Sequence, residues 1–396
     1  MKSKFALFAG GRVLGSLLQA IIFLLFTRVS TISEVGAAGI VFGACLFLGT
    51  FADLGMMNFV SRARAVNRDD HEVAQALVVN RYTSIAAAAV FAFGAWALAP
   101  TGVSSLALAL LAISVAVEKN VETALAVPIA DDIGVMPATS IVLRRASALV
   151  AFLALQVTGL DGLTSYAVSA LIGNLVGQIQ IQIWLSKHVR ASNDIRFSHL
   201  VSVAQKGAPF LLSNVAGQAR TLDTVFLGLF STSFQAGLYA AATRLTAPLM
   251  LVPGTLTTIL MPHAAKSSSA AARTTARNII LAYLACLLPL GIVGIFAEPL
   301  IVLVLTDRFA GAALPFTVAL LSVPFVALSP ALGAILQGQG HERLVAINGV
   351  VSACVLLVAL VAGSIGLGAT GVALAVGVVY FLKSVSLWQS IRTHLH

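Results

Sequence analysis

The chain has 396 residues, of which 59% are hydrophobic and only 10% are charged, and its mean hydropathy is +0.97. Soluble domains usually carry about 25% charged residues, and disordered chains combine low hydrophobicity with high charge. The composition therefore excludes both classes. Because the apolar runs are long and continuous, and not the short alternating segments of a membrane β-barrel, we predict an all-α polytopic membrane protein.

Apolar runs of about 20 residues are long enough to cross the hydrocarbon core of a bilayer. Taken in chain order, these runs predict twelve spans: 5–27, 36–58, 77–99, 105–127, 138–160, 164–186, 208–230, 236–261, 278–297, 312–337, 345–363 and 369–388. We interpret the first run as a retained span, because Arg12 interrupts it and it is longer than a signal peptide. The apolar segment 298–308 is expected to be an interfacial helix.

The basic residues predict the orientation. With the N-terminus in the cytoplasm, the inner loops and termini hold sixteen Lys and Arg, Arg144 and Arg145 among them, whereas the outer loops hold only Arg28 and Arg308. The positive-inside rule then places both termini in the cytoplasm. The net charge of +9 follows from the same bias, so no nucleic-acid partner is predicted.

Catalytic and metal-binding patterns are missing. Cys45, Cys286 and Cys354 lie singly in apolar runs, and the seven histidines have no ligand spacing. The chain lacks a GxxxxGK[ST] loop, and the predicted outer loops are too short for a catalytic site. We predict a protein that is not an enzyme and needs no cofactor or metal.

An internal repeat is predicted from two observations. The polar connection 187–206 separates six spans from six, and the outer turns 30–36 and 231–237 both place glycine at the start of the next helix. Because each half has an even number of spans, both halves begin on the same side of the membrane and share one topology, as in transporters with parallel repeats. We expect two six-helix lobes, 1–200 and 201–396, that rock about a central cavity.

Several segments resemble a known family. Residues 206–248 contain a Pro-Phe entry, the triplet Leu222-Asp223-Thr224, the turn Gly237-x-Tyr239, and Arg244; the segments 51–55, 261–262 and 315–340 agree. In these features the chain resembles the polysaccharide (O-antigen type) flippases of the multidrug/oligosaccharidyl-lipid/polysaccharide exporter superfamily. It departs from them at 306–309, where the family pattern leads us to expect glycine.

The resemblance implies location in the cell (inner) membrane and transport of a polyprenyl-diphosphate-linked oligosaccharide across it for cell-surface polysaccharide synthesis. A polysaccharide polymerase or glycosyltransferases are the partners that it implies. The other readings are an ion-coupled multidrug exporter of the same superfamily, a peptidoglycan-precursor flippase, for which additional C-terminal spans are expected, and a scaffold without transport activity.

Charged residues inside spans are candidates for function, because a charge at the centre of a membrane helix costs roughly 2.5–3.5 kcal/mol. The substrate-binding candidates are the basic residues Arg12, Arg81, Lys119, Arg220 and Arg244. The candidates for H+ or Na+ coupling are the acidic residues Glu118, Glu122 and Asp223. The alternative for each is structural: snorkelling of Arg12 and Arg81, a Lys119–Glu122 pair, and an Arg220–Asp223 pair three residues apart.

Overall fold

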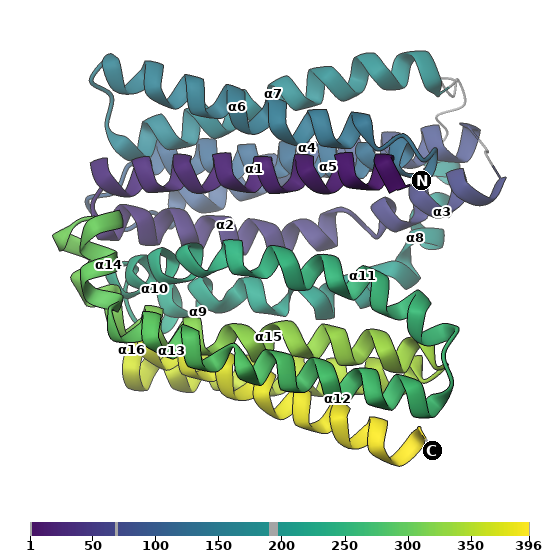
Figure 1. The fold of residues 1–396 in the computed structure, drawn as a ribbon. Coiled ribbons are helices and arrows are strands. Elements are labelled where there is room, and N and C mark those ends of the chain that lie inside the picture. The colour runs from purple at the N-terminus through teal and green to yellow at the C-terminus, as the bar shows by residue number, and fades with distance from the viewer. Residues whose placement is uncertain (1, 68–69, 190–196, 396) are drawn as a thin grey trace. The chain divides into compact units, whose positions relative to one another are not determined.

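The computed structural model describes residues 2–67, 70–189 and 197–395, and within these ranges the chain forms helices and turns without a strand (Figure 1). The predicted all-α fold is therefore confirmed. The chain divides into two compact units, Met1–Leu222 and Asp223–His396. The lobe boundary at residue 200, which follows from the repeat, stays a prediction.

The first unit is built from eight α-helices and one 3-10 turn in its described residues. These are α1 (Lys2–Val29), α2 (Ile32–Ala52), α3 (Met56–Asn67), α4 (Asp70–Ala97), α5 (Ser105–Ala130), α6 (Val135–Val157), α7 (Gly162–His188), α8 (Phe197–Gln218) and η1 (Ala219–Leu222). The predicted span 36–58 is broken between α2 and α3, because Leu54 and Gly55 adopt left-handed conformations with φ of +51° and +74°. Such conformations cannot continue an α-helix.

The second unit contains two long helices, α15 and α16, and several short ones. They are α9 (Asp223–Phe230), α10 (Ser233–Thr246), η2 (Ala247–Met250), α11 (Leu251–Ala265), α12 (Ser269–Ala285), α13 (Leu287–Ile295), α14 (Ala297–Val304), η3 (Asp307–Ala312), α15 (Ala313–Gly338) and α16 (Glu342–His394). The last two predicted spans both lie in α16, which consists of two helices that meet at Gly368, where φ is +56° and ψ is −130°.

Each unit is organised around one buried helix. In the first unit α5 packs against α2, α3, α4 and α7; in the second, α15 packs against α10, α11, α13 and α16. α5 corresponds to the fourth predicted span and α15 to the tenth, so each is the fourth span of its half. This equivalence supports the predicted parallel repeat.

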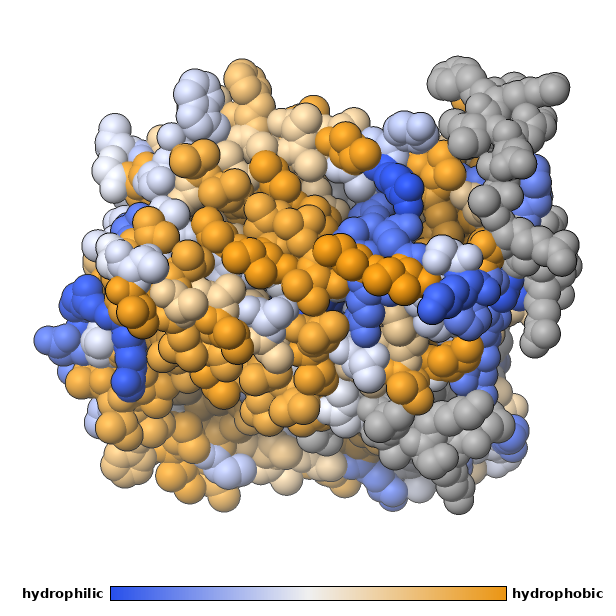
Figure 2. Space-filling model, turned by 90° about the horizontal axis from the view of Figure 1, so that it is seen from above, coloured by the Kyte–Doolittle hydropathy of each residue, from blue (hydrophilic) through white to orange (hydrophobic). Residues whose placement is uncertain are grey.

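The outer faces of the helices are apolar. Val150 is 68% exposed and Val157 is 90% exposed, both on α6, and Figure 2 shows a mostly hydrophobic face with hydrophilic residues gathered toward its two ends. Eight described helical segments are long and apolar enough to cross a membrane. The number is lower than the twelve predicted spans for three reasons. α5 carries three charges, some predicted spans are divided into shorter helices, and the last two predicted spans are joined in α16. The length and composition of these helices are those of a multi-pass membrane protein.

Small residues let α1 approach α6 closely. A Cβ atom at Gly11 would lie 2.7 Å from the Cβ and 2.8 Å from the Cα of Ala138, whereas a Cβ at Gly10 would meet nothing within 4 Å. Close approach of helices at small residues is the usual way in which membrane helices gain packing energy.

We therefore expect Gly11→Leu to lower the free energy of unfolding by about 1–3 kcal/mol, because the new side chain overpacks a backbone contact. Gly10→Leu is the matched control, one residue away on the same helix, and should leave stability nearly unchanged. Thermal unfolding of the purified proteins in detergent measures the difference. Equal melting temperatures for the two variants would contradict the packing of α1 on α6.

Candidate functional site

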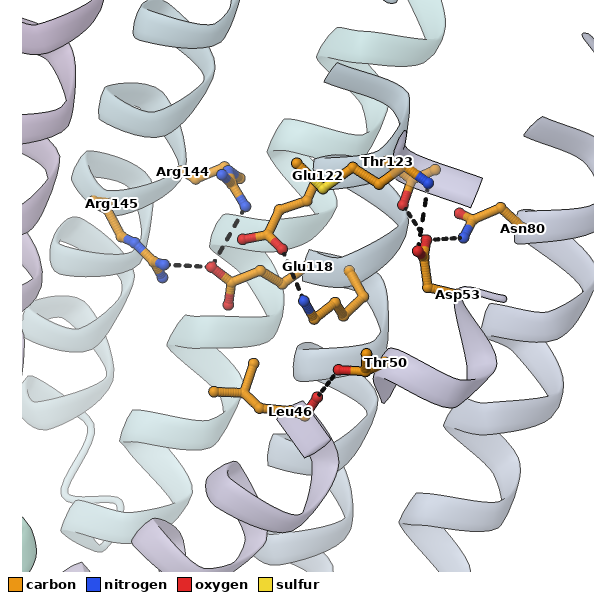
Figure 3. A network of polar contacts seen from close by, with 11 residues as sticks. Leu46, Thr50, Asp53, Asn80, Glu118, Glu122, Thr123, Arg144 and Arg145 are labelled. Atoms are coloured by element: carbon orange, nitrogen blue, oxygen red, sulfur yellow. Dashed lines mark hydrogen bonds and ion pairs between the residues drawn. The ribbon is translucent and has the colours of Figure 1, made fainter. Parts of the chain in front are cut away.

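Two arginines of α6 share one carboxylate of α5 in the interior of the first unit (Figure 3). Arg145 Nη2 donates a hydrogen bond to Glu118 Oε1, and Arg144 Nη1 lies 3.6 Å from the same oxygen. Glu118 is only 8% exposed and Arg144 only 3%. Arg144 Nε and Nη1 have no hydrogen-bond partner among the described residues. Since one carboxylate cannot neutralise two guanidinium groups, the three residues together retain one positive charge.

Glycines of α7 create the space for this arrangement. A Cβ at Gly177 would collide with the aliphatic stem of Arg144, and a Cβ at Gly173 would lie 2.9 Å from the Cβ of Ala148. The Arg144 side chain therefore lies across the bare backbone of α7. Packing of this kind fixes the guanidinium group beside Glu118.

A second ion pair lies one turn further along α5. Lys119 Nζ is 3.3 Å from Glu122 Oε2, and both side chains are partly exposed. The predicted Lys119–Glu122 contact is thus present. We call Glu118, Lys119, Glu122, Arg144 and Arg145 the α5–α6 charge cluster; its three basic and two acidic residues leave one net positive charge.

The positions of Arg144 and Arg145 correct the count of basic residues from which the orientation was predicted. Arg144 and Arg145 were assigned to a cytoplasmic loop, but they lie in the interior of α6 and are paired with Glu118. The number of Lys and Arg residues assigned to the predicted inner loops and termini therefore falls from sixteen to fourteen. Their position inside the predicted span 138–160 was the signal that could have identified them as site residues.

A neutral polar network surrounds Asp53, the C-cap residue of α2 (Figure 3). Asp53 Oδ1 accepts hydrogen bonds from Asn80 Nδ2 of α4 at 3.0 Å and from Thr123 Oγ1 of α5 at 2.6 Å. Asp53 Oδ2 accepts a longer one from the backbone N–H of Met57, at 3.4 Å. Asn80 Oδ1 in turn accepts from Asn120 Nδ2 at 2.8 Å. These partners come from separate helices, so the linear sequence did not show them as a group.

The remaining predicted residues of the first unit lie on α1, α4 and η1. Arg12 is exposed on α1, and Arg81 is exposed on α4, where its Nη2 donates a 2.6 Å hydrogen bond to Gln182 Oε1 of α7. Arg220 is half-buried in the turn η1. Their predicted contact with substrate stays a prediction.

The predicted residues of the second unit are Asp223 and Arg244. Asp223 Oδ2 accepts a 2.8 Å hydrogen bond from the hydroxyl of Tyr239, and its Oδ1 accepts one from the backbone N–H of Thr224 at 2.7 Å. Arg244 is half-buried in the last turn of α10. Asp223 is thus held at the start of α9 by a buried tyrosine of α10.

Comparison with known proteins defines the relatives of this chain. The model of the polysaccharide biosynthesis protein family matches residues 2–268. No curated protein matches the chain.

Solved structures share the fold at low sequence identity. The lipid II flippase MurJ in an inward closed conformation has a TM-score of 0.72 at 13% identity, over 98% of this chain and 87% of that chain. An inward-facing multidrug resistance transporter of the MATE family, within the MOP superfamily, has a TM-score of 0.71 at 13% identity, over 96% and 94%. A mutant of the MATE transporter VcmN of Vibrio cholerae has 0.63 at 14% identity, over 100% and 98%. The fold is therefore the one that these flippase and transporter structures share.

Proposed function

This chain belongs to the polysaccharide biosynthesis protein family, and we propose that it is a flippase for a polyprenyl-diphosphate-linked oligosaccharide. The substrate would cross the inner membrane by alternating access of the two lobes. The observation that supports this substrate is the net positive charge of the α5–α6 charge cluster, which lies inside the predicted membrane region. Guanidinium groups bind diphosphate oxygens in a bidentate manner, and a low dielectric strengthens the attraction.

Multidrug export is the second candidate, because MATE-family transporters share the fold. Exporters of cationic drugs need carboxylates that are not outnumbered by basic groups near the substrate path. In the α5–α6 charge cluster the basic groups are in excess, which disfavours cationic substrates. An anionic headgroup is the better fit.

Arg145→Gln tests this proposal, because it removes the surplus charge and leaves two balanced pairs, Arg144–Glu118 and Lys119–Glu122. We expect export of surface polysaccharide to fall about tenfold or more, since a charge-assisted hydrogen bond contributes about 1.5–3 kcal/mol. Arg145→Lys retains the charge and is the matched control. The protein level in the membrane should be unchanged in both variants.

The assay uses cells that lack the chromosomal gene. These cells should accumulate lipid-linked repeat units on the cytoplasmic leaflet, and the wild-type gene should restore export. Arg220→Ala and Arg244→Ala are expected to fail to restore it. Normal polysaccharide export by Arg145→Gln would contradict the proposed substrate, and so would accumulation of lipid-linked repeat units on the outer leaflet of the deleted cells. If the wild-type gene restores drug resistance to these cells and not polysaccharide export, the multidrug exporter is favoured.

A further inference from the structure

The two halves of α16 run antiparallel in the second unit and contact each other along their length. A Cβ at Gly363 would lie 2.5 Å from the carbonyl oxygen of Gly371, so the two backbones are in close contact near the turn. Asn348 lies fifteen residues before Gly363, and Ser386 lies fifteen residues after Gly371. A 2.7 Å hydrogen bond from Asn348 Nδ2 to Ser386 Oγ joins these two side chains. The two helices therefore keep one register over this distance.

Lys383 and Ser352 extend this contact by one turn. Lys383 lies three residues before Ser386, and Ser352 lies four residues after Asn348, so the antiparallel register places them at the same level. Residues three or four apart share one face of a helix, and the four polar side chains thus form one strip between the two halves. Ser352 Oγ donates a 3.5 Å hydrogen bond to Asn348 Oδ1. We call Asn348, Ser352, Lys383 and Ser386 the hairpin seam.

Lys383 brings a positive charge into the hairpin seam. Its side chain is half-buried, and its Nζ lies 5.6 Å from the centre of the Tyr380 ring. Among the described residues no carboxylate pairs with it. A cation at membrane depth is costly without a counter-charge, and an aromatic ring compensates only part of that cost. The hairpin seam is therefore a site that favours an anion.

The hairpin seam opens on an apolar face of the second unit. Ser384 Oγ donates a 3.3 Å hydrogen bond to the carbonyl oxygen of Phe325, so this side of the helix faces α15. Ser386 is exposed and lies about 200° further around the helix, which directs it away from α15. Val351 beside the seam is 56% exposed, and Leu382 is 53% exposed. Acyl chains of a lipid would find an apolar surface next to the seam.

The hairpin seam lies within reach of the membrane surface. Eleven residues, about 16 Å of helix, separate Lys383 from His394, whose ring lies 5.5 Å from that of His341. Lysine side chains near the ends of membrane helices extend toward the headgroups. The same end of the hairpin carries an excess of basic residues, since its charged side chains are the exposed Glu342, Arg343 and Arg392. The ammonium group of Lys383 can thus meet the phosphate level of the bilayer.

We propose that the hairpin seam binds the phosphate group of an anionic phospholipid in the leaflet next to the C-terminus. Lys383 supplies the charge, and the hydroxyls of Ser352 and Ser386 and the second N–H of the Asn348 amide supply hydrogen-bond donors. One ammonium group balances the single charge of a phosphodiester, whereas a diphosphate carries more than one. Basic sites between helices near the membrane surface recognise lipid headgroups in this way.

Native mass spectrometry of the purified full-length protein, titrated with phosphatidylglycerol in detergent, tests the proposal. Lys383→Gln should weaken the binding about tenfold or more, the size expected for the loss of one charge-assisted hydrogen bond, whereas Lys383→Arg should retain it. Lys266→Gln is the matched control, because it removes the same charge from an exposed residue at the end of α11, outside the hairpin seam. It should bind phosphatidylglycerol as the wild type does.

Ser352→Glu tests the same site without a change at Lys383. By the antiparallel register the new carboxylate lies at the level of the Lys383 ammonium group and neutralises it, so the affinity for phosphatidylglycerol should fall as it does in Lys383→Gln. This variant keeps the test valid if Lys383→Gln does not fold. Thermal unfolding without added lipid identifies the folded variants, and phosphatidylglycerol should raise the melting temperature of the wild type more than that of either variant.

The choice of ligand separates the possible sources of the phosphate group. Phosphatidylcholine, which has no net charge, should bind equally to the wild type and to Lys383→Gln. sn-Glycerol 3-phosphate should not displace phosphatidylglycerol, because it has no acyl chains; displacement would assign the seam to a soluble phosphate ester. Tighter binding of a polyprenyl diphosphate than of phosphatidylglycerol would make the seam a substrate site. Either of these last two results would overturn the phospholipid assignment.

Equal affinity for phosphatidylglycerol in the wild type, Lys383→Gln and Ser352→Glu would also overturn the proposal, and the polar contacts of the hairpin seam would then serve only to hold the two helices together. An equal loss in Lys266→Gln would do the same, because it would indicate attraction by net charge alone. The site is separate from the proposed transport function, and no transported substrate takes part in the measurement. The result of the Arg145→Gln export test therefore leaves it unaffected.

Discussion

Replacement of Glu118 by alanine should destabilise the protein more than any other single substitution in the first unit. It leaves the buried Arg144 and the half-buried Arg145 without the carboxylate that they share, and removal of one partner from a buried ion pair costs about 3–5 kcal/mol. The measurement is thermal or denaturant unfolding of the purified protein in detergent. We also expect a lower protein level in the membrane.

Glu122→Ala is the matched control, because Glu122 lies on the same helix one turn away, its side chain is 39% exposed, and its partner Lys119 reaches solvent more easily. It should cost less than about 1 kcal/mol. The double variant Glu118→Ala/Arg145→Ala should recover part of the loss, since it buries one uncompensated guanidinium group and not two. Equal stability of Glu118→Ala and Glu122→Ala would refute the shared carboxylate.

Gly368→Val should have the next largest effect, a loss of about 2–4 kcal/mol. The φ of +56° and ψ of −130° at Gly368 lie where residues with a Cβ are strained by about 1–3 kcal/mol. A Cβ would also lie 2.7 Å from Gln235 Oε1, which accepts a 3.0 Å hydrogen bond from the backbone N–H of Ala369. The substitution therefore strains the backbone and displaces the residue that caps the second half of α16.

Gly366→Val is the control for this prediction, because a Cβ at Gly366 meets nothing within 4 Å. Unfolding of both variants in detergent provides the comparison. If Gly366→Val and Gly368→Val have the same stability, the two halves of α16 do not meet at Gly368.

Composition and hydropathy predicted most of the fold. The helices α1, α4, α6 and α7 each match one predicted span, because a continuous apolar run has few ways to satisfy its backbone in lipid other than a helix. The predicted span 36–58 extends across the interruption at Leu54 and Gly55. Both residues are apolar or small, so the hydropathy pattern continues across a break that depends on backbone conformation.

The site was predicted only in part. Glu118, Lys119 and Glu122 were identified because charges inside an apolar run are conspicuous, and the pair Lys119–Glu122 follows from helical spacing. The bond from Arg145 to Glu118 joins two helices, and so do the bonds from Asn80 and Thr123 to Asp53. Sequence spacing within one helix contains no information about contacts between helices, which depend on how the bundle packs.

The shared carboxylate has a consequence for biosynthesis. α5 and α6 are consecutive and joined by a short turn, and α5 is synthesised first. If α6 left the translocon alone, transfer of its two arginines into the membrane would cost about 2.5–3.5 kcal/mol each, or roughly 5–7 kcal/mol together. Glu118 in the preceding helix offsets much of this cost if the two segments partition into lipid together. The acidic partner thus precedes the basic ones along the chain, and α5 and α6 are expected to enter the bilayer as a single hairpin.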